Sequence, residues 1–151
     1  MKSISIKTKI GWVTAFEKDN KIFRIKFVKS KTQSNSTILK KFKSSLLKYF
    51  KNETNNIKID YKLTANSTQK KVWYEMKKIK KGDTRSYGDL AKKFNLSPRQ
   101  IGKICGQNKL PLIIPCHRVI RSDGSLGGFT AAGGVKLKKK ILQFEKKNTF
   151  N

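Results

Sequence analysis

Hydrophobic and polar residues alternate along the first 28 positions in the manner of β-strands. In the stretch IFRIKFV, Phe23, Ile25 and Phe27 share one face, and the basic residues between them point the other way. The polar run EKDNK precedes this stretch and is typical of a turn. The pattern therefore predicts strands over residues 3–28, with a hairpin at 11–28.

The hydrophobic period lengthens to three or four residues after Ser36, which indicates an amphipathic helix. The residues that set this period are Leu39, Phe42, Leu46 and Phe50. The polar run NETNN ends the helix, and IKIDYKL at 57–63 alternates again, as a further strand would. Residues 1–63 are thus predicted to form a small α/β unit, whose scattered acidic residues make no catalytic pattern.

The second half of the chain opens with a polar stretch, TANSTQ at 64–69, which is either a linker or the start of a helix. Val72, Met76 and Ile79 then recur at helical spacing, and Gly82 ends the pattern. A second structural unit is therefore expected to begin near residue 64.

Two short helices are predicted next. The first carries Leu90, Ala91 and Phe94 on one face, and the second starts with Ser97 as a natural N-cap and Pro98 at the first helical position. The second helix turns Ile101, Ile104 and Cys105 inward, and Arg99, Gln100 and Lys103 outward. Such a pair fits a DNA-binding helix-turn-helix, with a packed helix pair that merely has a basic outer face as the alternative.

The composition supports a folded protein and gives no sign of export. Hydrophobic residues make up 36% of the 151 and aromatics 10%, enough for the core of one domain or of two small ones. The longest apolar runs are only a few residues, so no membrane span is predicted. The start, MKSISIKTKIGW, shows no secretory signal, and we expect a cytoplasmic protein in which Cys105 and Cys116 stay reduced.

The formal net charge of +27 favours a polyanionic partner, most often nucleic acid. Compositional bias is the alternative, because lysines dominate the charge and are spread along the whole chain. The arginines are more informative, since Arg85, Arg99, Arg118 and Arg121 all fall between positions 85 and 121.

Candidate chemistry lies in PLIIPCHRVIR, where Cys116 is followed by His117, the sole histidine. Pro115 disfavours a continuing strand, so the thiol is expected at a strand end or a turn. An ordinary thiol is mostly protonated at neutral pH, and a nucleophilic one needs a base, for which His117 is the candidate. Because adjacent strand residues face opposite ways, contact between the two requires a turn or an intervening water.

Other interpretations of this pair compete. A buried cysteine beside a half-exposed histidine needs no chemistry at all. A zinc site is poorly supported, because two cysteines and one histidine offer only three soft ligands, and Cys105 lies on a helix core. A cysteine hydrolase usually draws its thiol and imidazole from distant segments.

The surrounding motifs decide between these interpretations. The stretch IIPCHRVI, followed by GSLGGF and KKKILQFE, resembles the O6-alkylguanine-DNA alkyltransferase family, which repairs methylated DNA by moving the alkyl group onto its own cysteine. SYGDLA, SPRQIG and QNKLPLIIP match the helix-turn-helix and approach strand of that family, in the same order. The resemblance covers about residues 68–147, and the first 63 residues match in architecture only.

The resemblance implies an α+β fold in two domains. Residues 1–63 would form a small ribonuclease H-like α/β domain, and residues 64–151 a winged helix-turn-helix domain that binds DNA and accepts the alkyl group. The implied protein is a monomer without a cofactor. Some relatives carry zinc in the N-terminal domain, but residues 1–63 contain no Cys or His to bind it.

The resemblance also assigns roles in the reaction. Cys116 would be the alkyl acceptor, and His117 would take its proton through a water. Glu145 would orient the histidine, with Gln143 as the alternative because FTAAGGVK is two residues longer than in the shortest relatives. Asn108 would tie the turn beneath the thiol.

Further positions are expected to contact the substrate. Tyr87, Val119 and Phe129 would wall the pocket, with Thr130 near the oxygen of the lesion, and Phe129 replaces the tyrosine of many relatives. Arg99 would enter the duplex in place of the extruded base. The residues expected to bind DNA are Arg99, Gln100, Lys103, Arg85 and Ser97.

The function implied is a single, irreversible transfer from O6-alkylguanine in double-stranded DNA to Cys116, with O4-alkylthymine as a second candidate lesion. The main rival is a winged-helix protein that binds DNA or lesions without transferring anything. Relatives that only bind damage lack the cysteine, whereas Cys116 is present here. A cysteine hydrolase, the other rival, would turn over many times.

Overall fold

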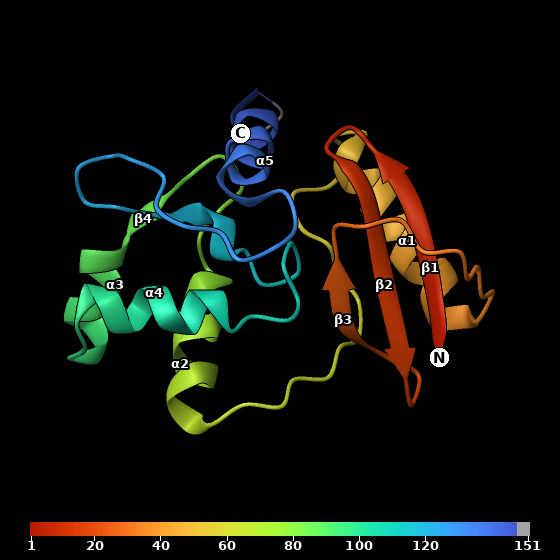
Figure 1. The fold of residues 1–151 in the computed structure, drawn as a ribbon, viewed down its shortest axis with the longest axis horizontal. Helices are drawn as coiled ribbons and strands as arrows, with labels where there is room; N and C mark the ends of the chain where they lie inside the picture. The colour runs from red at the N-terminus through yellow and green to blue at the C-terminus, as the bar shows by residue number, and fades with distance from the viewer. Residues whose placement is uncertain (148–151) are drawn as a thin grey trace.

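The computed structural model describes residues 1–147. Its N-terminal half contains an antiparallel sheet in the order β1-β2-β3, formed by β1 (Lys2–Thr8), β2 (Gly11–Lys18) and β3 (Lys21–Lys26). Helix α1 (Thr37–Phe50) covers one face of this sheet, and β3 is the strand nearest the C-terminal half (Figure 1). The strands predicted over residues 3–28 are therefore present.

The β2–β3 hairpin turns at Asp19 and Asn20, both of which are left-handed, with φ of 54° and 59°. Asp and Asn tolerate that conformation, and two such residues match the twist of adjacent strands. A register shift in β3 opposite Phe16 and Glu17 leaves Phe23 outside the pairing. Ile22 is consequently buried and Phe23 only half-buried, so the face expected from strict alternation is wrong at this position.

Helix α1 begins where the sequence predicts. Ser36 caps it by accepting a hydrogen bond from the Leu39 backbone N–H, and its hydroxyl also bonds to the Glu17 carboxylate. The buried face of the helix comprises Ile38, Leu39, Phe42, Leu46, Tyr49 and Phe50. This stripe packs against the sheet and forms the core of the N-terminal half.

The strand predicted at 57–63 does not form. The segment makes a single parallel bridge between Ile22 and Tyr61, with hydrogen bonds from Ile22 N to Asp60 O (3.0 Å) and from Lys62 N to Ile22 O (2.9 Å). Its alternate residues are still less exposed than their lysine and aspartate neighbours. The alternation therefore reflects packing on the core surface, which produces the same pattern as a strand without a hydrogen-bonded ladder.

In the C-terminal half, α2 (Ser67–Met76) begins with a reciprocal capping pair, Asn66 and Gln69. The helix ends at Met76, three residues before Ile79, which was the last residue of the predicted helical spacing. Ile79 is instead buried in the turn that follows. A short strand, β4 (Arg85–Ser86), then leads into α3 (Tyr87–Phe94).

Asn95, left-handed with φ 55°, ends α3, and α4 (Pro98–Gly106) follows after two residues. Ser97 and Pro98 occupy the cap and first-turn positions that the sequence predicts. The tight connection places α3 and α4 side by side (Figure 1).

The last elements bring the chain back between the two halves. A 3-10 turn, η1 (Cys116–Arg118), is followed by β5 (Val119–Ile120), which pairs in parallel with β4. Helix α5 (Gly134–Lys147) buries Leu137, Lys138, Ile141 and Glu145. Along residues 1–147, no helix is both long and apolar enough to cross a membrane.

Candidate active site

The chain approaches Cys116 through a compact turn, not through the expected strand. The Asn108 side chain donates to the Ile114 carbonyl (2.9 Å) and accepts from the Leu110 N–H (2.9 Å). Leu112 is left-handed, with φ 74°, a conformation that is uncommon for residues other than glycine, asparagine and aspartate. Asn108 thus ties the segment that carries the cysteine, and η1 begins at Cys116 itself.

Cys116 lines a cavity of about 750 Å³. The cavity is walled by residues from α3, α4 and the loop before α5, namely Tyr87, Pro98, Arg99, Gly102, Cys105, Gly106, Arg121, Gly127, Gly128, Phe129 and Thr130. Tyr87, Phe129 and Thr130, which the resemblance assigns to substrate contact, are among these lining residues. Val119 is not on the wall, because its side chain is fully buried and only its carbonyl faces a polar partner.

Gly127 is required for the shape of this cavity. Its φ is 73°, and an added Cβ would lie 2.9 Å from Cε2 and from the hydroxyl oxygen of Tyr87. Only glycine therefore allows the loop to pass so close to the Tyr87 ring. On the other side, Thr130 donates to the Gly106 carbonyl (3.1 Å) and fixes the loop to the end of α4.

His117, the residue that follows Cys116, forms a buried pair with Glu145. His117 Nε2 lies 2.8 Å from Glu145 Oε1, and the two side chains are 1% and 0% exposed. His117 Nδ1 is buried and has no hydrogen-bond partner among the described residues. Gln143 is exposed, so the structure brings Glu145, and not Gln143, to the imidazole.

Arg118 completes the arrangement around Glu145. Its Nε and Nη2 donate to Oε1 (2.9 Å) and Oε2 (2.6 Å), and its Nη1 donates to the Ile79 carbonyl (2.7 Å). Burial acts to raise the pKa of Glu145, but the interactions with His117 and Arg118 outweigh it and hold that pKa well below the usual range. Glu145 is therefore a permanent anion beside the histidine.

Burial shifts the thiol and the imidazole toward their neutral forms. Burial raises the pKa of the Cys116 thiol, and the Asn108 hydrogen bond and the Lys138 charge offset only part of this rise. Burial also lowers the pKa of His117, and Glu145 opposes this only in part. At neutral pH the resting site thus holds a protonated thiol and an uncharged imidazole that can accept a proton.

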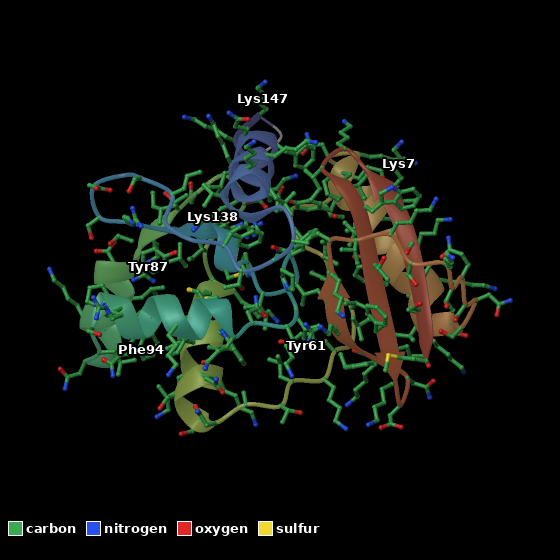
Figure 2. All side chains as sticks on the ribbon, in the orientation of Figure 1. Lys7, Tyr61, Tyr87, Phe94, Lys138 and Lys147 are labelled. Atoms are coloured by element: carbon green, nitrogen blue, oxygen red, sulfur yellow. The ribbon has the colours of Figure 1, made fainter. Side chains whose placement is uncertain are left out.

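Lys138 is a site residue that the sequence analysis missed. Its side chain is fully buried, and its Nζ donates to the Val119 carbonyl (2.7 Å), the Tyr87 hydroxyl (3.2 Å) and the Gly128 carbonyl (3.4 Å). Figure 2 shows Lys138 and Tyr87 together in the C-terminal half. The available signal was helical spacing, because Lys138 lies seven residues before Glu145 and so falls on the same face of α5.

The residues expected to contact DNA divide into two groups. Arg99 borders the cavity mouth, and Lys103 is exposed on α4. Ser97 and Gln100 bond to each other as a reciprocal cap of α4, and Arg85 is paired with Glu75 at 3.1 Å. Ser97 thus has the capping role that the sequence predicts, whereas the partners of Gln100 and Arg85 were not foreseen.

No cluster of three or more His, Cys, Asp or Glu side chains that could hold a metal occurs within residues 1–147, and Cys105 and Cys116 are free thiols. Cys105 packs inward, with its Sγ 3.7 Å from the Met76 sulfur. Burial raises the pKa of Cys105 to about 12, as expected of an inert core thiol.

Comparison with known proteins finds relatives of this chain in sequence and in structure. The model of the 6-O-methylguanine DNA methyltransferase DNA-binding domain matches residues 67–147. A methylated-DNA–protein-cysteine methyltransferase of Methanocaldococcus vulcanius is 45% identical over 131 residues, covering 85% of this chain and 80% of that protein. A probable methylated-DNA–protein-cysteine methyltransferase of Acanthamoeba polyphaga mimivirus is 36% identical and covers 99% of both chains.

The fold agrees with these sequence matches. The crystal structure of Mycobacterium tuberculosis OGT in complex with DNA superposes with a TM-score of 0.85 at 26% identity, covering 99% of this chain and 95% of that one. The mixed α/β architecture is thus shared over the whole described length. The chain belongs to the methylated-DNA–protein-cysteine methyltransferase family.

Proposed function

We propose that the protein repairs alkylated DNA by moving an alkyl group from the O6 oxygen of guanine to the Sγ of Cys116, once per molecule. A sulfur–carbon bond forms, the carbon–O6 bond breaks, and guanine leaves with the electron pair of that bond. The observation that carries the proposal is a cysteine that lines a cavity and is followed directly in the chain by a histidine paired with a buried carboxylate. O4-alkylthymine presents the same exocyclic oxygen chemistry and is a second candidate substrate.

The hydrogen-bond geometry supports a direction for proton transfer. Glu145 is an anion and accepts only, so His117 carries a proton on Nε2 and donates it to Oε1. Nδ1 then holds a lone pair and can receive the thiol proton through a bridging water. The resulting imidazolium is stabilised by Glu145, as a carboxylate stabilises the histidine of a hydrolase triad.

Tyr87 is placed to assist the leaving guanine. Burial raises the pKa of Tyr87 to about 12, so its hydroxyl stays protonated. Lys138 Nζ donates to that oxygen, which leaves the hydroxyl hydrogen available to the substrate. A donor fixed in this way can stabilise the negative charge that develops on the purine as the alkyl bond breaks.

The substrate base must leave the helix to reach this cavity, because the thiol lies inside the protein. Arg99 at the cavity mouth would fill the space that the base vacates. We assign α3 and α4 to a helix-turn-helix within a winged DNA-binding domain of residues 64–151, and residues 1–63 to a ribonuclease H-like domain. Exposed lysine side chains occur in both halves of the chain, so contacts to phosphates would dominate affinity.

The proposal is tested by mixing stoichiometric protein with duplex DNA that contains O6-methylguanine and weighing the intact protein. The expected result is a gain of one methyl group per molecule, located on Cys116, and no gain in Cys116→Ala, which still binds DNA. Binding without a mass change would support the non-catalytic rival. Many turnovers per molecule would support a hydrolase.

A further inference from the structure

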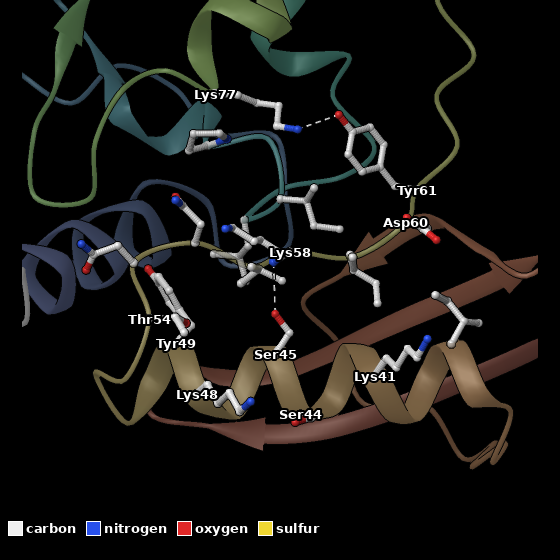
Figure 3. A pocket seen from close by; sticks show the side chains of 18 of the residues that line it. Lys41, Ser44, Ser45, Lys48, Tyr49, Thr54, Lys58, Asp60, Tyr61 and Lys77 are labelled. Carbon is white, nitrogen blue, oxygen red and sulfur yellow. Dashed lines mark hydrogen bonds between the residues drawn. The ribbon is translucent and has the colours of Figure 1, made fainter.

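Tyr49, on helix α1 of the N-terminal half, reaches the carboxylate of the proposed proton relay. Its hydroxyl donates to Glu145 Oε2 at 2.5 Å, across 96 positions of sequence, and the ring is only 2% exposed. Figure 3 shows Tyr49 standing on α1 at a groove between α1 and the C-terminal half, a groove that Arg118 also lines. The N-terminal half therefore contacts Glu145 directly.

The surroundings hold the Tyr49 ring in one orientation. Phe50 packs edge-on against it, with the ring centroids 4.9 Å apart, and Phe144 packs at 5.5 Å. The ammonium of Lys81 lies 4.6 Å from the Tyr49 centroid and donates to Asn52 Oδ1 at 3.3 Å. A phenol clamped on several sides delivers its hydroxyl to a fixed point, which a mobile side chain or a water would not do.

Glu145 Oε2 thus receives hydrogen bonds from Tyr49 and Arg118, while Oε1 faces His117. We infer that Tyr49 is a positioning residue for alkyl transfer, whose hydroxyl fixes the Glu145 carboxylate and withdraws part of its charge from His117. This inference rests on the proposed function, because it concerns the same proton relay.

The charged and titratable groups around His117 allow the sign of the effect to be worked out. They are Cys116 and Arg118 on η1, Lys138 and Glu145 on α5, Lys81 from the turn before β4, and Tyr49 from α1. Burial and the charge of Glu145 raise the pKa of Tyr49, so the phenol stays a donor over the whole working range of pH. Its loss leaves more negative charge on Glu145, which favours the imidazolium and raises the pKa of His117.

The variant Tyr49→Phe tests the inference because it keeps the ring and removes only the hydroxyl. His117 is the sole histidine, so its imidazole resonance can be titrated by NMR without ambiguity. We expect the pKa of His117 to rise by about 0.5 to 1 unit, an ordinary size for a change in one charged neighbour's hydrogen bonding. The acid limb of the single-turnover transfer rate should move to higher pH by the same amount, while the rate well above that limb changes little.

A matched control is Leu46→Ala, which removes a fully buried side chain from the same helix one turn earlier. It should destabilise the fold without moving the titration of His117 or the acid limb. If Tyr49→Phe likewise lowers stability but leaves both pH readouts at their wild-type values, Tyr49 is a packing residue and the inference is wrong.

Two further readouts separate this inference from others. In the wild-type protein the Tyr49 hydroxyl proton should give a downfield, slowly exchanging NMR resonance, and its absence would contradict the inference even if Tyr49→Phe does not fold. If wild-type protein transfers no methyl group, the proposed function fails, whereas the shift in the His117 titration still reports on the contact itself.

Discussion

The imidazole of His117 and the carboxylate of Glu145 lie 2.8 Å apart, although 28 positions separate them in sequence. Neither side chain has significant contact with solvent. Burying the Glu145 carboxylate beside an imidazole costs desolvation free energy. The hydrogen bonds from Arg118 offset that cost. Because His117 directly follows Cys116 in the chain, this pair links the stability of the fold to the chemistry of the thiol.

Removing the charge of Glu145 should impair both transfer and folding. In Glu145→Gln the imidazolium loses its counter-charge, and we expect single-turnover transfer from O6-methylguanine DNA to slow about 100-fold or more, the range typical of a lost acid–base contribution. Arg118 is left buried without a full partner, so the free energy of unfolding should fall by about 3 kcal/mol. The control is Gln143→Ala on the exposed face of α5, and a comparable loss of transfer in that variant would contradict the assignment.

The stability of the protein should fall as the pH drops from about 7.5 to about 5, because burial depresses the folded-state pKa of His117. Below its unfolded value of 6.5, the unfolded chain binds a proton that the folded chain does not. Glu145, whose pKa is also depressed, stabilises above its unfolded value of 4.5, and that contribution is lost only as the pH falls further. Thermal unfolding measured from about pH 7.5 to well below pH 4.5 should show that His117→Gln loses the stability decline near neutral pH and keeps the decline due to Glu145 at lower pH.

A methyl group at Gly127 should deform the cavity, whereas one at its neighbour should not. In Gly127→Ala the new Cβ meets Tyr87 at 2.9 Å from a left-handed backbone, which costs about 1–2 kcal/mol of strain before the ring is displaced. We expect transfer to slow markedly with DNA binding retained. The matched control is Gly128→Ala, whose Cβ has no heavy atom within 4 Å. Equal loss in the two variants would argue against a role for the Tyr87 contact.

Arg99 and Lys103 lie on the same helix and should respond differently to removal. Arg99→Ala should slow repair of duplex DNA more than reaction with the free O6-methylguanine base, because only the duplex must be held open. Lys103→Ala should weaken DNA binding and reduce the slope of log affinity against log salt by about one, with the two substrates keeping their relative rates. Equal slowing of duplex and free base in Arg99→Ala would contradict its base-replacement role.

The local elements were largely predictable, because helix periods, caps and turns depend on neighbouring residues. Ser36, Ser97 and Pro98 marked helix starts where the structure has them. The strand predicted at 57–63 failed because alternation reports which side chains face the core, not whether the backbone has a ladder partner. Phe23 was misplaced because the register shift in β3 arises from pairing with β2, which the pattern of one strand does not contain.

The sequence by itself determined the thiol, the imidazole and the motif that joins them, since the order of Cys116 and His117 is a covalent fact. Only the tertiary structure decided which distant groups surround them. Tyr49 and Lys138 reach the site through burial and hydrogen bonding between segments far apart in the chain. Such contacts are selected by the packing of the whole core, in which a buried polar group must find a partner wherever the fold supplies one.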